Sequence, residues 1–113
     1  MTTPQAALAQ LWSFAGMRPN ALGAVTLTGS EPVLPSSFRV ATAAQASIAA
    51  SALAAAEIHR LRTRQRQEVR VDMRHAAIEF RCERHLRVGD GPAHASWDRI
   101  AGLHQCGAGR WVR

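Results

Sequence analysis

The residues best suited to chemistry are nine arginines between Arg60 and Arg87, in a chain of 113 residues that contains no lysine. The formal net charge is +6. Guanidinium groups bind phosphate, so nine of them on one face would form a nucleic-acid interface. However, Glu68, Asp72 and Glu79 are interleaved with them. This mixture favours a solvated, salt-bridged face or a protein interface, and a small basic nucleic-acid-binding module stays open as an alternative.

Four potential metal ligands occur at helical offsets, namely His75, Glu79, Cys82 and His85. Zinc ligands on one helix do lie three or four residues apart. Four ligands strung along three turns cannot converge on one ion, so we expect packing residues and no metal site. No Ser-His-Asp or Cys-His set can be assembled by spacing, and the residues alone therefore assign no catalytic group.

The sequence indicates neither secretion nor membrane insertion. Cys82 and Cys106 form no Cys-x-x-Cys pair, and the N-terminus lacks a basic segment followed by an apolar one. The longest weakly polar run, residues 41–58, is mostly alanine and is interrupted by Gln45 and Ser47, so no membrane partner is expected. We expect a cytoplasmic protein with both thiols free and buried.

The first third of the chain predicts one amphipathic helix and a connecting segment. Apolar residues at helical spacing, among them Leu8 and Trp12, predict a helix over residues 4–15. Residues 18–37 are rich in proline and glycine and predict connecting chain, with one β-like run at residues 24–27.

A long alanine-rich helix is predicted over residues 39–61. Ser36 and Ser37 are expected to cap its N-terminus, and arginines at its C-terminus complement the helix dipole. Small residues recur four apart on one face, where a neighbouring helix backbone can approach closely. These residues are Ala43, Ser47, Ser51 and Ala55.

Short elements follow the long helix. Alternation over residues 68–72 predicts a strand with one covered face, and the apolar spacing from Met73 to Phe80 predicts a second helix. A turn at residues 87–92, an irregular stretch at 93–100 and a β-hairpin centred on residues 107–109 complete the chain. We therefore predict an α/β or α+β fragment made of a long Ala-rich helix, a short strand, a second helix and a C-terminal β-hairpin.

One ordered set of residues runs through these elements: Ala55, Ala56, Arg60, Arg62, Thr63, Gln67, Val69, Val71, Met73, Ala76-Ala77-Ile78, Trp97-Asp98, Ile100-Ala101-Gly102 and Gly109-Arg110-Trp111-Val112. The set resembles family III coenzyme A transferases, the family of formyl-CoA transferase, the carnitine CoA-transferases and α-methylacyl-CoA racemase. Members share a long small-residue helix with a basic end, a glycine-containing turn, an alternating strand and a helix that begins near Met or Leu. The likeness covers residues 38–113.

Two departures from the family pattern concern the chemistry and the turn. The family's catalytic Asp, which attacks the acyl-CoA thioester to form an acyl-enzyme anhydride, corresponds to Thr42 here, and threonine cannot replace a carboxylate in that role. The family's two turn glycines correspond to Arg64 and Arg66, where a positive φ would be strained. We therefore assign no catalytic residue and expect the isolated chain to be inactive.

The resemblance implies an N-terminal helix and loop at residues 1–37 and a transferase-like segment at residues 38–113. It implies an enzyme of acyl-CoA metabolism that transfers coenzyme A between carboxylic acids, with acyl-CoA as substrate and no covalently bound cofactor. Nothing in residues 1–35 matches the family's nucleotide-binding-like half. The resemblance therefore implies the N-terminal piece of a longer, divergent bacterial member, dependent on a homo-oligomeric partner or a missing C-terminal half. A non-enzymatic helical interaction domain is the remaining alternative.

Overall fold

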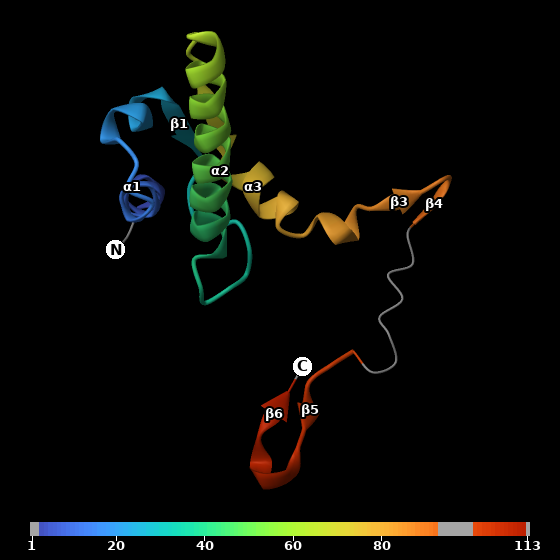
Figure 1. Ribbon diagram of the computed structural model, residues 1–113. Helices are drawn as coiled ribbons and strands as arrows, with labels where there is room; N and C mark the ends of the chain where they lie inside the picture. The colour runs from blue at the N-terminus through green and yellow to red at the C-terminus, as the bar shows by residue number, and fades with distance from the viewer. Residues whose placement is uncertain (1–2, 93–100, 113) are drawn as a thin grey trace. The chain divides into compact units, whose positions relative to one another are not determined.

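The computed structural model describes residues 3–92 and 101–112. The chain divides into two compact units, Met1–Cys82 and Glu83–Arg113. In the first unit the elements are α1 (Pro4–Phe14), the 3₁₀ helix η1 (Pro19–Ala24), β1 (Val25–Thr28), α2 (Val40–Thr63), β2 (Val69–Asp72) and α3 (Met73–Glu79) (Figure 1). This mixture of helices and short strands confirms the predicted mixed α/β class.

The first unit is built on a β1–α2–β2 arrangement. β1 and β2 pair in parallel, with Val25 opposite Val69 and Thr28 opposite Asp72. Parallel neighbours require a long crossover connection, and α2 lies within the one that joins them. In Figure 1, α2 stands in front of β1, with α1 on one side and α3 on the other. The strand predicted at residues 68–72 is present and one residue shorter, and the β-like run at residues 24–27, expected to be connecting chain, forms β1 with a shift of one residue.

The core lies between α2, α1 and the two strands. Leu53 and Ala49 of α2 are fully buried, and Leu8 of α1 and the alternating valines of β2 pack in the same region. Trp12 is also buried, and its indole Nε1 donates a hydrogen bond to the backbone carbonyl of Arg18 at 2.8 Å. This bond fixes the chain that leaves α1 against the body of the unit, because a buried indole N–H needs an acceptor.

The small-residue face of α2 is turned outward, which corrects the expectation that a neighbouring helix packs there. Ala43, Ser51 and Ala55 are exposed, and Ser47 is half-buried. The hydroxyls of Ser47 and Ser51 donate to backbone carbonyls of α2 itself. The physical reason is that α1 and the sheet cover the face that carries Leu53, where larger apolar area can be buried.

The second helix is shorter than predicted. α3 ends at Glu79, and Phe80 is half exposed instead of completing a buried stripe, whereas Met73, Ala76 and Ala77 are buried as expected. Beyond Ala77 the apolar side chains have no covered surface to pack on, and short helices without tertiary packing are marginal. A separate 3₁₀ turn, η2, follows at Cys82–Arg84.

Among its described residues, the second unit contains two small hairpins. The expected turn at residues 87–92 is an antiparallel pair of β3 (Arg87–Val88) and β4 (Gly91–Pro92). The predicted C-terminal hairpin is confirmed, since β5 (His104–Gln105) and β6 (Trp111–Val112) pair in antiparallel fashion around the short 3₁₀ turn η3 (Gly107–Gly109). The irregular stretch expected at residues 93–100 lies outside the described residues.

The structure tests the expectation that both cysteine thiols are buried. Cys82 and Cys106 are free but exposed, so the prediction of buried thiols is wrong. Both lie where little apolar surface is covered, Cys82 after the end of α3 and Cys106 at the start of a hairpin turn. Across the described residues, no helix has the length and apolar character needed to cross a membrane.

Candidate functional site

Two polar sites lie at opposite ends of α2, and the first contains Thr42. This residue is buried in the first turn of the helix. Its backbone N–H and its hydroxyl both donate to one oxygen, Oε1 of Glu31, at 2.7 and 2.9 Å. The first N–H groups of a helix have no partner within it, so the Glu31 carboxylate caps α2 from the loop that follows β1.

This cap replaces the one expected from the sequence. The N-cap residue Arg39 makes no side-chain capping bond to the helix. Ser36 Oγ accepts from the backbone N–H of Phe38 at 3.0 Å, which stabilises a local turn before the helix begins. The prediction that Ser36 and Ser37 cap the helix is therefore wrong, because α2 starts at Val40 and a carboxylate from farther back reaches its free N–H groups.

The environment of Glu31 favours its charged form. Burial acts to raise the pKa of Glu31, but the hydrogen bonds from the N–H and hydroxyl of Thr42 outweigh it, and the pKa lies below its ordinary value. The carboxylate is therefore ionised at neutral pH and is a weak base. The hydroxyl of Thr42 is buried and directs its proton at that carboxylate, and threonine cannot form an acyl anhydride.

Further hydrogen bonds, made by Gln45 and Asp72, join α2 and α3 to the carboxyl ends of β1 and β2. Gln45 is buried, and its Nε2 donates to the backbone carbonyls of Thr28 and Val71, both at 2.8 Å. Asp72 accepts from the N–H groups of Arg74 and His75, which caps α3. These contacts set the position of the first turn of α2 relative to the sheet.

Asp72 also reaches across the sheet. Its Oδ2 accepts a hydrogen bond from the hydroxyl of Thr28 at 3.0 Å. The backbone N–H of His75, followed by the Thr28 hydroxyl, holds the pKa of Asp72 below its usual value. Gly29 lies beside this contact with φ +90, and a Cβ there would stand 2.9 Å from Cβ of Met73. The strand end therefore requires glycine at this position.

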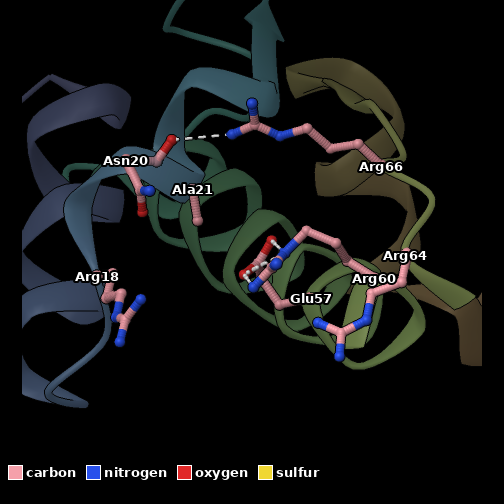
Figure 2. Close-up of a pocket in the computed structure, with 7 residues that line it drawn as sticks. All are labelled: Arg18, Asn20, Ala21, Glu57, Arg60, Arg64 and Arg66. Atoms are coloured by element: carbon pink, nitrogen blue, oxygen red, sulfur yellow. Dashed lines mark hydrogen bonds and ion pairs between the residues drawn. The ribbon is translucent and has the colours of Figure 1, made fainter. Parts of the chain in front are cut away.

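The second site is an arginine pocket near the C-terminal end of α2 (Figure 2). The cavity has a volume of about 350 Å³. Its lining residues are Arg18, Asn20, Ala21, Glu57, Arg60, Arg64 and Arg66. Four guanidinium groups and one carboxylate leave this lining with a net charge of about +3. A cavity of this size and charge suits a small anion.

Two of the four arginines are held by protein groups. Arg60 contacts both carboxylate oxygens of Glu57 through three hydrogen bonds of 3.0 to 3.1 Å, and Arg66 donates to the backbone carbonyl of Asn20 at 3.2 Å. The hydrogen bond from Arg60 lowers the pKa of Glu57, and the same bond raises the pKa of Arg60. Both groups therefore stay charged over the ordinary pH range.

The other two arginines are Arg18 and Arg64, whose guanidinium groups have no hydrogen-bond or ion-pair partner among the described residues. Their backbones are fixed nonetheless. The carbonyl of Arg18 accepts from Trp12, and the N–H of Arg64 donates to the carbonyl of Arg60 at 2.8 Å. Figure 2 shows the side chain of Arg18, the residue before η1, apart from those of Arg60 on α2 and of Arg64 in the turn after α2.

Arg64 has a left-handed backbone, with φ 65 and ψ 5, and ends α2 as its C-cap residue. This conformation favours glycine, because Cβ crowds the following carbonyl. The positive φ anticipated as a source of strain therefore occurs at Arg64. Arg66, by contrast, is not among the described non-glycine residues with positive φ.

The sequence did not predict that any arginines gather on one face, and the structure corrects this in part. Three of the nine, Arg60, Arg64 and Arg66, line one pocket, together with Arg18 from outside the run. The others do not join them there. Arg70, for example, is exposed on β2 and pairs with Glu68 at 3.1 Å. Separate elements bring Arg18 to the pocket, so no local pattern could have revealed it.

The four potential metal ligands do not share one helix. His75 and Glu79 lie on α3, Cys82 lies in the following 3₁₀ turn, and His85 belongs to the second unit. The helical offsets assumed for all four are wrong because α3 ends at Glu79. Within residues 3–92 and 101–112, no three His, Cys, Asp or Glu side chains come together to hold a metal ion.

Sequence reasoning missed Glu31, Gln45 and Arg18 as site residues. Glu31 stands in a proline-containing loop, and Gln45 resembles an ordinary polar interruption of an alanine helix. The usual capping signals join residues only a few positions apart, whereas Glu31 caps a residue 11 positions away.

Comparison with family models, curated proteins and solved structures finds no match to this chain.

Proposed function

We propose that the chain is part of a CoA-transferase-like protein, which moves coenzyme A between carboxylic acids, and that this segment binds acyl-CoA without completing the transfer. The observation that carries the proposal is the backbone of Arg64. The resemblance equates this position with a turn glycine, and the residue has φ 65, a conformation that glycine adopts without strain. This agreement supports the residue-by-residue equivalence that places the family's catalytic position at Thr42.

The setting of Thr42 also supports the proposal. The resemblance places the reactive residue at the start of the long helix, and Thr42 lies in the first turn of α2. A carboxylate is present there, but it belongs to Glu31 and approaches from a different part of the chain. The N–H and hydroxyl of Thr42 already donate to Glu31, so an acyl-CoA thioester bound at this turn would have to displace that carboxylate before the helix N-terminus could orient its carbonyl.

The same geometry is the reason for proposing binding without turnover. Anhydride formation on Glu31 would use a carboxylate whose Oε1 already accepts two hydrogen bonds from Thr42. Those bonds lower the pKa of Glu31 and stabilise the free carboxylate relative to an acylated one. The resting arrangement therefore opposes acylation.

The outward small-residue face of α2 supports a dependence on further protein. Ala43, Ser51 and Ala55 leave a surface on which a helix backbone can approach closely. We propose that a second copy of the chain, or the remainder of a longer protein, covers this face. We also assign the protein to the cytoplasm, where acyl-CoA pools are accessible.

Thermal unfolding of the full chain with coenzyme A and acetyl-CoA tests the proposal. A ligand that binds only the folded chain stabilises it by about 2.7 kcal/mol at a concentration 100 times its dissociation constant. We expect both ligands to raise the unfolding temperature, and we expect intact-mass spectrometry to detect no acyl adduct. Absence of any shift at millimolar ligand would contradict the assignment.

A matched pair of variants tests the position of the site. Thr42→Val should reduce the shift that acetyl-CoA produces, because it removes the hydroxyl. Thr63→Val removes an exposed hydroxyl at the far end of the same helix and should leave the shift unchanged. Equal shifts in both variants would place the binding site elsewhere.

A further inference from the structure

We propose that the arginine pocket binds the diphosphate group of a small organic ligand, such as a nucleoside diphosphate. This inference does not rest on the proposed function. Thr42 and Arg60 lie on one continuous helix, 18 residues apart, which corresponds to about 27 Å along its axis. The pocket is therefore a site separate from the first turn of α2.

The first argument is charge that the protein leaves unneutralised. Glu57 forms an ion pair with Arg60, and the carbonyl of Asn20 accepts a hydrogen bond from Arg66. No described residue pairs with the guanidinium groups of Arg18 and Arg64. Planar guanidinium groups bind phosphate oxygens in a bidentate manner. Several of them around one cavity suit a ligand with more than one negative charge.

The second argument is strain at Arg64. A residue other than glycine in the left-handed region is unfavourable, and such residues are retained mainly where the surroundings or a function require them. Glycine at this position would end α2 with less strain. The side chain that stands there instead lines the pocket and has no protein partner among the described residues. Ligand binding gives this strained arginine a role.

The third argument is organisation of the pocket before any ligand arrives. Arg60 is oriented by three hydrogen bonds to Glu57, and Arg66 is tethered to η1. Trp12 fixes the backbone of Arg18. Ordering side chains in advance reduces the entropy lost on binding.

An adjoining cavity of about 360 Å³ offers room for the organic part of the ligand. It shares Arg18, Glu57 and Arg60 with the arginine pocket. Its remaining lining includes Trp12, Met17 and Leu61, which supply apolar surface. A diphosphate held by the arginines would place an attached apolar or aromatic group against this surface.

The decisive variant is Arg64→Gly, because it should move stability and binding in opposite directions. Removal of the left-handed strain should raise the unfolding temperature by about 2 to 6 °C. Loss of one charged hydrogen-bonding group should weaken binding of pyrophosphate and ADP at least about tenfold. A side chain with only a structural role would not produce this combination.

Two further variants complete the design. Arg18→Gln removes the other unpartnered guanidinium and should weaken both ligands similarly. Arg62→Ala removes one positive charge from the same end of α2, but Arg62 does not line the pocket, and its affinities should match those of the unmodified chain. Isothermal titration calorimetry at about 0.15 M salt measures all four proteins.

We expect the unmodified chain to bind pyrophosphate and to bind ADP more tightly. Arg64→Gly and Arg18→Gln should each weaken binding of both ligands, whereas Arg62→Ala should not. Failure of both ligands to bind the unmodified chain would overturn the inference, as would equal affinities in all variants. An oligonucleotide that binds more tightly than ADP, and that Arg62→Ala weakens as much as Arg64→Gly, would reveal a diffuse nucleic-acid surface and also overturn it. Coenzyme A also carries a diphosphate, so the variants separate the two sites: Arg64→Gly should weaken ADP binding whatever acetyl-CoA does, whereas Thr42→Val should leave ADP binding unchanged.

Discussion

Oε1 of Glu31 lies 2.7 Å from the backbone nitrogen of Thr42 and 2.9 Å from its hydroxyl oxygen, and so one carboxylate oxygen caps the longest helix of the protein. The loop after β1 is thereby tied to the first turn of α2. Because the loop and the helix both belong to the β1–α2–β2 arrangement, this contact contributes directly to the fold of the first unit.

Removal of this cap should destabilise the protein. Glu31→Ala leaves the Thr42 N–H and hydroxyl without their acceptor, and we expect a loss of about 1 to 2 kcal/mol in the free energy of unfolding. Urea denaturation measures the change. Glu68→Ala, which removes an exposed carboxylate paired with Arg70, should cost less than about 0.5 kcal/mol. An equal loss in both variants would show that Glu31 acts only through its charge.

The pH dependence of stability follows in part from the Glu31 carboxylate and from Asp72. Both have a pKa below the ordinary values of 4.5 and 3.8 in the folded chain. Below those values the unfolded chain binds more protons than the folded one, so acid favours unfolding. Their contribution to the free energy of unfolding should be fully present above pH 4.5. It should disappear as the pH falls through the lower pKa values that the two groups have in the folded chain.

Paired variants check this assignment. Glu31→Gln and Asp72→Asn together should flatten the acid limb of a plot of unfolding free energy against pH. An unaltered acid limb in the double variant would mean that other carboxylates control the acid sensitivity.

Gln45 should be among the most sensitive positions of α2. Gln45→Leu removes both donors to the carbonyls of Thr28 and Val71, which leaves two acceptors unpaired at the end of the sheet. We expect a loss of about 2 to 6 kcal/mol, from about one to three for each of the two acceptors that loses its partner. Ser51→Ala on the exposed face of the same helix should change stability by less than about 0.5 kcal/mol. Comparable losses would contradict the role assigned to the amide.

These residues show how far the sequence could predict the fold. Periodicity identified β2 and the long helix, because burial of Val69, Val71 and Leu53 imposes regular spacing on the sequence, whereas β1 was expected only as a β-like run in connecting chain. It did not identify the face of α2 that packs. Small residues are compatible with close packing as well as with exposure, and the choice depended on where α1 and the sheet could bury more apolar area.

The candidate sites were less predictable than the elements that carry them. The contact between Glu31 and Thr42 joins residues 11 positions apart, and the bond between Arg66 and Asn20 joins residues 46 apart. Contacts of this kind are created by tertiary folding and have no local spacing rule. The left-handed turn at Arg64 was anticipated only through the family resemblance, since arginine itself gives no turn signal.

The turn at Arg64 yields a prediction about stability that can be checked without any ligand. Arg64→Ala keeps the left-handed strain, whereas Arg64→Gly relieves it, so the glycine variant should be more stable than the alanine variant by about 1 kcal/mol. Guanidinium chloride or thermal unfolding compares the two. Greater stability of the alanine variant would mean that the turn does not retain φ near 65 in solution.

The most direct test of the proposed function is hydrogen–deuterium exchange of the full chain with and without saturating acetyl-CoA. We predict slower exchange of the amides in the loop that carries Glu31 and in the first turn of α2, around Thr42, because a bound thioester would cover that turn. Unchanged exchange there would contradict acyl-CoA binding at Thr42, and so would protection confined to the arginine pocket.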